Sequence, residues 1–233
     1  MTKNRVIHRT FIIFLLFVIM VGLLMVVYPE YEAKQIEQGM EESAEKWMAK
    51  KASDDSKDFS ELYEAMENYN KEIRENLQAG LVDAWSYQTE VFDLIEYGVD
   101  DGAVGVIFIP KIDVSLPLYL GASYENMAKG FAQLSQTSMP IGGLGTNCVV
   151  ACHRGFQGAA YMRDADRLEV GDTVYLENFW DTLHYKVREI KVIEPHEIEE
   201  ILIQPGRDLL TIVTCTPYRV GTHRLLIICE RIA

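Results

Sequence analysis

Positive charge is scarce in this chain of 233 residues, which carries 22 Lys and Arg against 35 Asp and Glu. The formal net charge is −13, and such a surface repels nucleic-acid phosphates and anionic lipid. We therefore expect no nucleic-acid partner, and cationic or lysine-bearing partners are favoured. Acidity is also a common route to solubility, so the charge alone identifies no partner.

Charge of either sign is absent from residues 11–28, a run of eighteen mostly apolar residues. A run of this length is just enough to cross a hydrocarbon layer of ~30 Å at ~1.5 Å per residue. A cleaved signal peptide usually has a shorter apolar core followed by small residues, whereas Tyr-Pro-Glu-Tyr-Glu follows here. We expect a retained transmembrane anchor, with a signal peptide as the alternative.

The charges that flank this run differ in sign. Lys3, Arg5 and Arg9 precede it, and Glu30 and Glu32 follow it. This bias keeps the N-terminus in the cytoplasm and places the rest of the chain outside the membrane. That remainder has 19 basic and 35 acidic residues, a net charge of −16.

Cysteine is also sparse, with four residues in the chain. Four cysteines outside a cell can form a disulfide framework with three possible connectivities. Cys148 and Cys152 lie about 13 Å apart in one predicted strand, whereas bridged Cα atoms lie within about 7 Å, so these two do not pair. Either can meet Cys229, and a structural disulfide is the alternative interpretation of Cys215.

Proline is absent from residues 31–80, and glycine occurs there only at Gly39 and Gly80. Two apolar stripes with helical spacing run through this region. They consist of Ile36, Met40, Ala44 and Trp47, and of Leu62, Tyr63, Met66, Tyr69, Ile73 and Leu77. We expect a helical hairpin or a pair of helices packed on the outside of the main domain. A coiled-coil stalk is the alternative.

From residue 102 onward, short apolar runs alternate with turn residues, the pattern of an all-β unit. The runs are 104–109, 114–120, 148–152, 173–177, 183–192, 209–214 and 224–232. Seven or eight strands in ~130 residues suit a closed or nearly closed barrel. We expect a mainly β fold in three parts: a flank and anchor (1–30), a helical extension (31–100) and a β-barrel (101–233).

Two of the predicted strands end in residues that suit acyl transfer. The segment Thr-Ile-Val-Thr-Cys ends in Cys215, and Arg224 follows nine residues later. The run Cys-Val-Val-Ala-Cys is followed by His153, Arg and Gly. A thiolate can attack a carbonyl, an imidazole can move the protons, and a guanidinium can stabilise the oxyanion. We expect these three side chains to meet at one end of the barrel.

These residues resemble the signature of the sortases, the cysteine transpeptidases of the Gram-positive cell surface. The matching pieces are Thr211-Ile-Val-Thr-Cys215 for the family's Thr-Leu-x-Thr-Cys strand, the later Arg224, and His153 in Cys-His-Arg-Gly. The likeness covers about residues 100–232. The string Cys-Thr-Pro-Tyr…Thr-His-Arg-Leu-Leu resembles the class C, pilus-building branch most closely. The resemblance implies a sortase-type closed barrel.

The resemblance also implies a mechanism. Cys215 attacks the threonine carbonyl of a Leu-Pro-x-Thr-Gly-like sorting signal and forms a thioester. His153 protonates the leaving amine and later deprotonates the incoming one. Arg224, whose pKa exceeds ~12, holds the substrate backbone and the oxyanion. Thr214 either adds a hydroxyl donor or points into the sheet, and no metal or cofactor is expected.

Class C sortases carry an Asp-Pro-Trp/Phe segment that covers the active site, and Asp83-Ala-Trp85-Ser stands in that place here. The resemblance implies that Trp85 covers the thiol while Asp83 pairs with Arg224. Ala84 replaces the family's proline, so this lid is expected to be less rigid. The alternative is that Trp85 is a core aromatic residue at the end of a helix.

The resemblance implies a single-pass membrane protein with its catalytic domain outside the cell. Its expected partners are pilins or surface proteins with C-terminal sorting signals, and a lysine-bearing acceptor. Two alternative functions remain: a housekeeping-type sortase that anchors proteins to cell-wall amines, and a non-enzymatic, membrane-tethered β-domain whose cysteine is structural.

Overall fold

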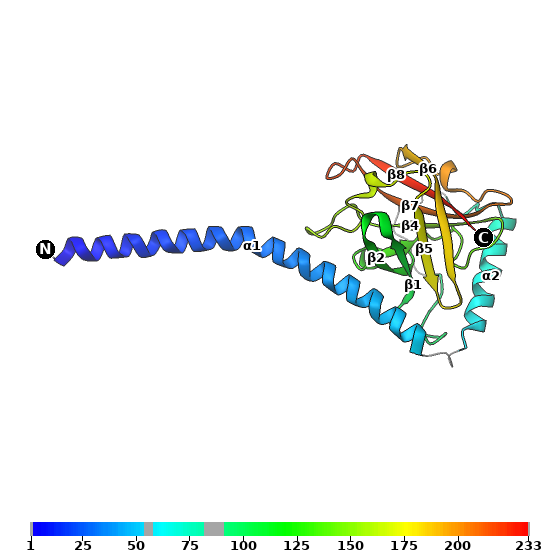
Figure 1. Ribbon diagram of the computed structural model, residues 1–233, viewed down its shortest axis with the longest axis horizontal. Helices are drawn as coiled ribbons and strands as arrows, with labels where there is room; N and C mark the ends of the chain where they lie inside the picture. Colours follow the sequence, from blue (N-terminus) through cyan, green and yellow to red (C-terminus); the bar gives the residue numbers. More distant parts are fainter. Residues whose placement is uncertain (1, 54–57, 82–90, 233) are drawn as a thin grey trace.

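The computed structural model describes residues 2–53, 58–81 and 91–232 (Figure 1). Its main body is a closed β-barrel in which eight strands of the described chain follow the order β1-β2-β3-β4-β7-β8-β6-β5. The strands are β1 (Ala103–Ile109), β2 (Val114–Leu120), β3 (Phe131–Gln133), β4 (Thr146–Ala151), β5 (Thr173–Asn178), β6 (Thr182–Ile193), β7 (Asp208–Thr216) and β8 (His223–Arg231). The expected mainly β fold with a closed barrel is confirmed. The sequence pattern missed only β3.

The helices lie outside the barrel. They are α1 (Thr2–Ser53), α2 (Ser60–Glu75) and the short α3 (Tyr124–Met127), with 3₁₀ helices at Pro110–Ile112, Ala165–Arg167 and Glu199–Ile201. The second half of α1 and helix α2 pack on the barrel, so the two predicted stripes serve the main domain and do not form a coiled-coil stalk.

The parallel pair β4 and β7 positions the site, because the predicted histidine and cysteine follow or end these strands. Their register runs from Thr146 opposite Asp208 to Ala151 opposite Val213. Both faces of the pair are covered by apolar side chains, which form the main core on one face and a second cluster around Ile201 on the other. Strands that are buried on both faces read as continuous apolar runs, which is why the sequence pattern identified them.

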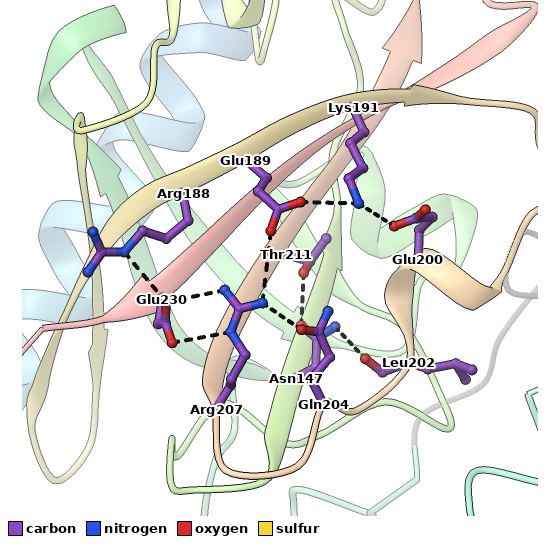
Figure 2. Close-up of polar contacts among 10 residues, drawn as sticks. All are labelled: Asn147, Arg188, Glu189, Lys191, Glu200, Leu202, Gln204, Arg207, Thr211 and Glu230. Atoms are coloured by element: carbon purple, nitrogen blue, oxygen red, sulfur yellow. Dashed lines mark hydrogen bonds and ion pairs between the residues drawn. The ribbon is translucent and has the colours of Figure 1, made fainter.

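A buried hydrogen bond joins these two strands. Thr211 of β7 donates its hydroxyl to the Asn147 side-chain oxygen of β4 at 2.8 Å (Figure 2). The Asn147 amide donates in turn to the carbonyl oxygens of Ile201 and Leu202 at 2.9 and 3.3 Å. One asparagine therefore ties β4, β7 and the β6–β7 connection together.

Charged side chains of alternating sign continue this arrangement toward β6 and β8 (Figure 2). Arg207 binds both carboxylate oxygens of Glu230 at 3.2 Å, and Lys191 bridges Glu189 and Glu200 at 3.1 and 2.7 Å. All five side chains are partly exposed, so each ion pair stabilises the fold only slightly. The bidentate geometry of Arg207 nevertheless fixes the start of β7 against the end of β8.

Helix α1 is continuous across the expected boundary between anchor and extension. The side chains of residues 11–28 are almost all exposed, and this helix is long and apolar enough to cross a membrane. Figure 1 shows that α1 changes direction near its middle, where Pro29 lies within the helix. Beyond the bend, Met40, Ala44 and Trp47 are buried, and the Trp47 indole donates to the Ala103 carbonyl oxygen at 3.0 Å.

Helix α2 buries Leu62, Met66 and Ile73 of the second stripe, and the Asn70 side chain accepts a hydrogen bond from the Met139 backbone at 2.7 Å. The prediction was wrong for Leu77, which is 85% exposed. The helix ends at Glu75 and Leu77 has a φ of +55°, so the helical spacing no longer applies there.

Candidate active site

Cys215 and Arg224 lie opposite each other where β7 and β8 pair. Residues directly opposite across an antiparallel pair point to the same face of the sheet, so the thiol and the guanidinium share one side. Arg224 donates to the carbonyl oxygens of Gly221 and His223 at 3.1 and 3.2 Å, which holds its side chain against the β7–β8 loop. Gly221 lies in the left-handed region, with a φ of +68°, directly beside Cys215.

His153 follows β4 and reaches the same end of the barrel, since β4 and β7 run in parallel. Its ring stacks on Phe156, with centroids 4.4 Å apart and an interplanar angle of 13°, and meets the edge of Tyr161 at 5.8 Å. Burial lowers the pKa of His153, so the neutral imidazole is favoured at pH 7. Its buried Nε2 atom has no hydrogen-bond partner among the described residues.

Two hydrogen bonds link the neighbours of His153 to the neighbours of Cys215. The Thr214 hydroxyl donates to the Cys152 carbonyl oxygen at 2.8 Å, and Arg154 donates to the Thr216 hydroxyl at 2.9 Å. The bond between Thr214 and Cys152 is buried in the sheet, and the bond between Arg154 and Thr216 is partly buried at the rim. The ends of β4 and β7 are therefore fastened on both sides of the candidate acid–base group and nucleophile.

Arg154 is only 8% exposed and uses its whole guanidinium. Besides Thr216 it reaches the Arg163 carbonyl oxygen at 3.2 Å and the Asp166 carboxylate at 2.9 Å. It thereby folds the loop after His153 onto the end of β7.

A pocket of about 140 Å³ contains all three predicted reactive side chains. It is lined by Ala122, Met127, Leu134, Ala151, Cys152, His153, Val213, Thr214, Cys215 and Arg224. The sequence predicted this meeting from strand ends alone. Thr214 also lines the pocket, but its hydroxyl is engaged by the Cys152 carbonyl oxygen. The predicted lid residues, Asp83 and Trp85, lie outside the described residues.

All four cysteines belong to the described chain and are free thiols. Cys148, Cys152 and Cys229 are buried, and burial raises the pKa of each thiol far above its usual value. Cys215 is the half-buried exception. The disulfide alternative for Cys215 is therefore wrong, and Cys215 is the thiol that solvent and substrate can reach.

Comparison with known proteins agrees with this arrangement. The family model described as the sortase domain matches residues 107–232, more than half of the chain. The chain belongs to the sortase family. Among solved structures, this sortase is similar to Streptococcus agalactiae sortase C1 in complex with MTSET, with a TM-score of 0.73 and 31% identity over 82% of this chain and 97% of that one.

A second structure, a pilus-related sortase C of Group B Streptococcus, is also 31% identical, with a TM-score of 0.65 over 75% of this chain and 91% of that one. Sortase A of Streptococcus agalactiae serotype III (strain NEM316) is 28% identical over 131 residues, which are 54% of this chain and 52% of that protein. The chain therefore spans about half the length of the curated relatives it matches.

The sequence pattern did not single out Arg154 or Phe156 as site residues. Both follow His153 closely, and Arg154 entered the sequence analysis only as part of the Cys-His-Arg-Gly match. Their partners lie far away in the chain or across the loop, so only the fold reveals that they support the histidine.

Proposed function

We propose that this sortase is a membrane-anchored cysteine transpeptidase that cleaves a Leu-Pro-x-Thr-Gly-like sorting signal and joins it to a lysine amine of a pilin subunit. The observation that supports it is the single pocket in which the only partly exposed thiol of the chain, Cys215, lies with His153 and Arg224. No further catalytic group is required for acyl transfer from a threonine carbonyl.

In the first step His153 takes the proton of the Cys215 thiol, the sulfur attacks the threonine carbonyl carbon, and Arg224 stabilises the negative charge on the oxygen. The tetrahedral intermediate collapses to a thioester, the Thr–Gly C–N bond breaks, and His153 gives its proton to the leaving amine. In the second step His153 takes a proton from the incoming lysine amine, which attacks the thioester. The products are an isopeptide bond and the free thiol.

Pilin as the substrate class is supported by the likeness to sortase C structures, one of which is described as pilus-related. The net charge of −16 on the part of the chain that follows the apolar run favours lysine-bearing partners. The likeness to a relative named Sortase A favours one second candidate, in which cell-wall amines accept the surface protein.

We further propose that residues 1–30 form a cytoplasmic flank and anchor, 31–100 a helical extension with the lid, and 101–233 the catalytic barrel. The apolar half of α1 and the basic residues before it support a cytoplasmic N-terminus. In this scheme Trp85 covers the thiol and Asp83 pairs with Arg224.

The test is incubation of the full chain, in detergent, with pilin substrates. We expect a ladder of covalent, SDS-resistant oligomers that disappears in Cys215→Ala, His153→Ala and Arg224→Ala. His184→Gln and Arg188→Lys are matched controls, because both side chains are exposed and lie on β6 away from the pocket, and they should retain the ladder.

Each alternative gives a different result. Cleavage of a sorting-signal peptide without a ladder, followed by transfer to a cell-wall amine, would favour the second candidate. A protein that neither cleaves nor forms a thioester adduct, while Cys215 still reacts with a thiol reagent, would refute the enzymatic proposal.

A further inference from the structure

The loop that follows His153 rests on the helix that carries the apolar run. Gly158 in this loop has a φ of +87°, and a Cβ atom there would lie 2.8 Å from the Cβ of Ala33 and 3.6 Å from the Pro29 carbonyl oxygen. The Glu37 carboxylate accepts a hydrogen bond from the Ala160 backbone at 2.7 Å. The loop therefore touches α1 along about two turns that begin directly after the apolar run.

The length of α1 sets the depth of this contact. Ala33 lies five residues beyond Tyr28, the last residue of the apolar run, which is about 7.5 Å along a helix. The polar headgroup layer on each side of a bilayer is roughly 5–8 Å thick. If residues 11–28 cross the hydrocarbon core, the tip of the loop at Gly158 lies at the level of the headgroups.

The β7–β8 loop belongs to the same rim. A Cβ atom on Gly155 would lie 2.8 Å from the Tyr218 ring, so the two loops are in close contact. Arg219 lies over that ring at 5.3 Å, and Val220 beside it is 66% exposed. In Figure 1 both loops point toward the side of the N-terminus, whereas β8 ends on the opposite side of the barrel.

The composition of this rim suits a membrane interface. Tyrosine and arginine place an apolar body against lipid tails while their polar ends reach headgroups and water, and an exposed valine adds apolar area. Arg163, which donates to the Gly158 carbonyl oxygen at 2.7 Å, and Arg219 can bind lipid phosphate. Glu30 and Glu32 are exposed at the same level of α1, so the net charge of this region does not attract lipid phosphate. The attraction to the membrane comes from the individual side chains of the rim.

We propose that this rim, formed by Gly158, Arg163, Tyr218, Arg219 and Val220, rests on the phospholipid headgroups of the membrane that α1 spans. The inference depends on the proposed anchor. Its consequence is that the pocket with Cys215 opens at the membrane surface.

The test is spin-label depth measurement on the full chain in phosphatidylcholine nanodiscs. All labels are placed in a Cys215→Ala background, because the remaining three thiols are buried. Val220→Cys reports the rim, and Leu144→Cys is the matched control. Leu144 is an apolar side chain, 74% exposed, just before β4 at the other end of the barrel, and strand β7 alone separates the two ends by roughly 26–30 Å.

We expect the label at position 220 to collide with a water-soluble nickel complex several-fold less often than the label at position 144. Equal collision rates would overturn the inference. A third label, Leu16→Cys, separates this failure from failure of the anchor. If the label at 16 is shielded from nickel but the label at 220 is not, only the rim proposal is wrong, whereas a water-exposed label at 16 refutes the proposed anchor as well.

Discussion

Arg154 donates a hydrogen bond of 2.9 Å to the hydroxyl of Thr216, and so joins the residue after the candidate acid–base histidine to the residue after the candidate nucleophile. Sixty-two positions separate the two residues in the chain. A hydrogen bond at this place does more than stabilise the sheet, because it fixes the distance between His153, which moves the protons, and Cys215, whose sulfur carries the acyl group.

We predict that Arg154→Lys lowers kcat for sorting-signal cleavage by ~10–100-fold while KM changes little, because misplacing reacting groups by about 1 Å is that costly. A lysine cannot reproduce the three contacts that the planar guanidinium makes. Arg167→Lys, on an exposed arginine of the same loop region, is the control. Since a buried arginine also supports folding, Thr216→Val provides a milder variant that removes only the acceptor. Wild-type kcat in a folded Thr216→Val enzyme would contradict this role.

A second hydrogen bond defines what Thr214 does. We predict that Thr214→Val destabilises the protein by about 1–3 kcal/mol, because it leaves the buried Cys152 carbonyl oxygen without this donor. Thr214→Ser keeps the hydroxyl and should recover most of the stability and activity. Chemical denaturation and peptide cleavage measure the two effects. If serine fails to restore activity although it restores stability, the threonine methyl group and not the hydroxyl bond serves the substrate.

Much of the site was predictable because its residues end apolar runs. Cys215 lies at the end of β7 and His153 follows β4, two strands that are buried on both faces, and such strands are visible as unbroken apolar segments. Arg224 opens the next strand after a short loop. Because β4 and β7 run in parallel and β8 returns directly after β7, the three side chains meet at one end of the barrel.

The parts that escaped prediction depend on contacts between distant segments. Strand β3 has only three residues, too few for a periodic signal. Leu77 fits the helical spacing of α2, yet the helix ends before it without a glycine or proline to mark the boundary. The hydrogen bond from the Ala160 backbone to the Glu37 carboxylate joins residues that are 123 positions apart, so no local sequence pattern predicts it.

The stacking of Phe156 on His153 predicts a pH effect. Because burial lowers the pKa of His153, removing the covering ring should raise it toward the ordinary value of about 6.5. We predict that Phe156→Ala shifts the imidazole titration to higher pH, as measured by NMR of the ring protons and by the acidic limb of the pH–rate profile. Phe108→Ala, which unstacks a ring from Tyr175 on β5, is the matched control. An unchanged midpoint in Phe156→Ala would show that this ring does not keep water from the imidazole.

The same pKa shift has a consequence for stability. The unfolded chain binds a proton at His153 more readily than the folded protein does, so the free energy of unfolding increases with pH across this titration. We predict that stability is lost as pH falls from about 6.5, the ordinary pKa that the unfolded chain has, through the lower pKa of the folded protein, and that His153→Gln removes this part of the pH dependence. Urea denaturation between pH 5 and pH 8 measures it. Parallel curves for the variant and the wild type would contradict the assignment.

Gly221 lies beside the thiol of Cys215. A Cβ atom at this position would lie 3.7 Å from the Cβ and 3.9 Å from the sulfur of Cys215, and its φ of +68° disfavours any side chain. We predict that Gly221→Ala costs ~1–2 kcal/mol and slows alkylation of Cys215. Gly206→Ala, with a φ of +76° and no neighbour within 4 Å, carries similar backbone strain without the contact. Its alkylation rate should remain that of the wild type. Equal slowing in both variants would mean that strain alone, and not shielding of the sulfur, is responsible.

The hydrogen bond from Ala160 to Glu37 makes α1 a support for the histidine loop as well as a tether. We predict that Glu37→Ala lowers kcat several-fold with KM unchanged, because the loop that carries Phe156 and Tyr161 loses its outer fastening. Glu37→Gln retains an oxygen acceptor and should restore kcat. Glu41→Ala, one turn further along the exposed side of the same helix, controls for lost charge. If the alanine and glutamine variants at position 37 have the same kcat, the carboxylate acts only through its charge. Rescue by glutamine, in contrast, excludes the charge as the cause, since the amide keeps the size and the acceptor oxygen of the side chain but is neutral at pH 7.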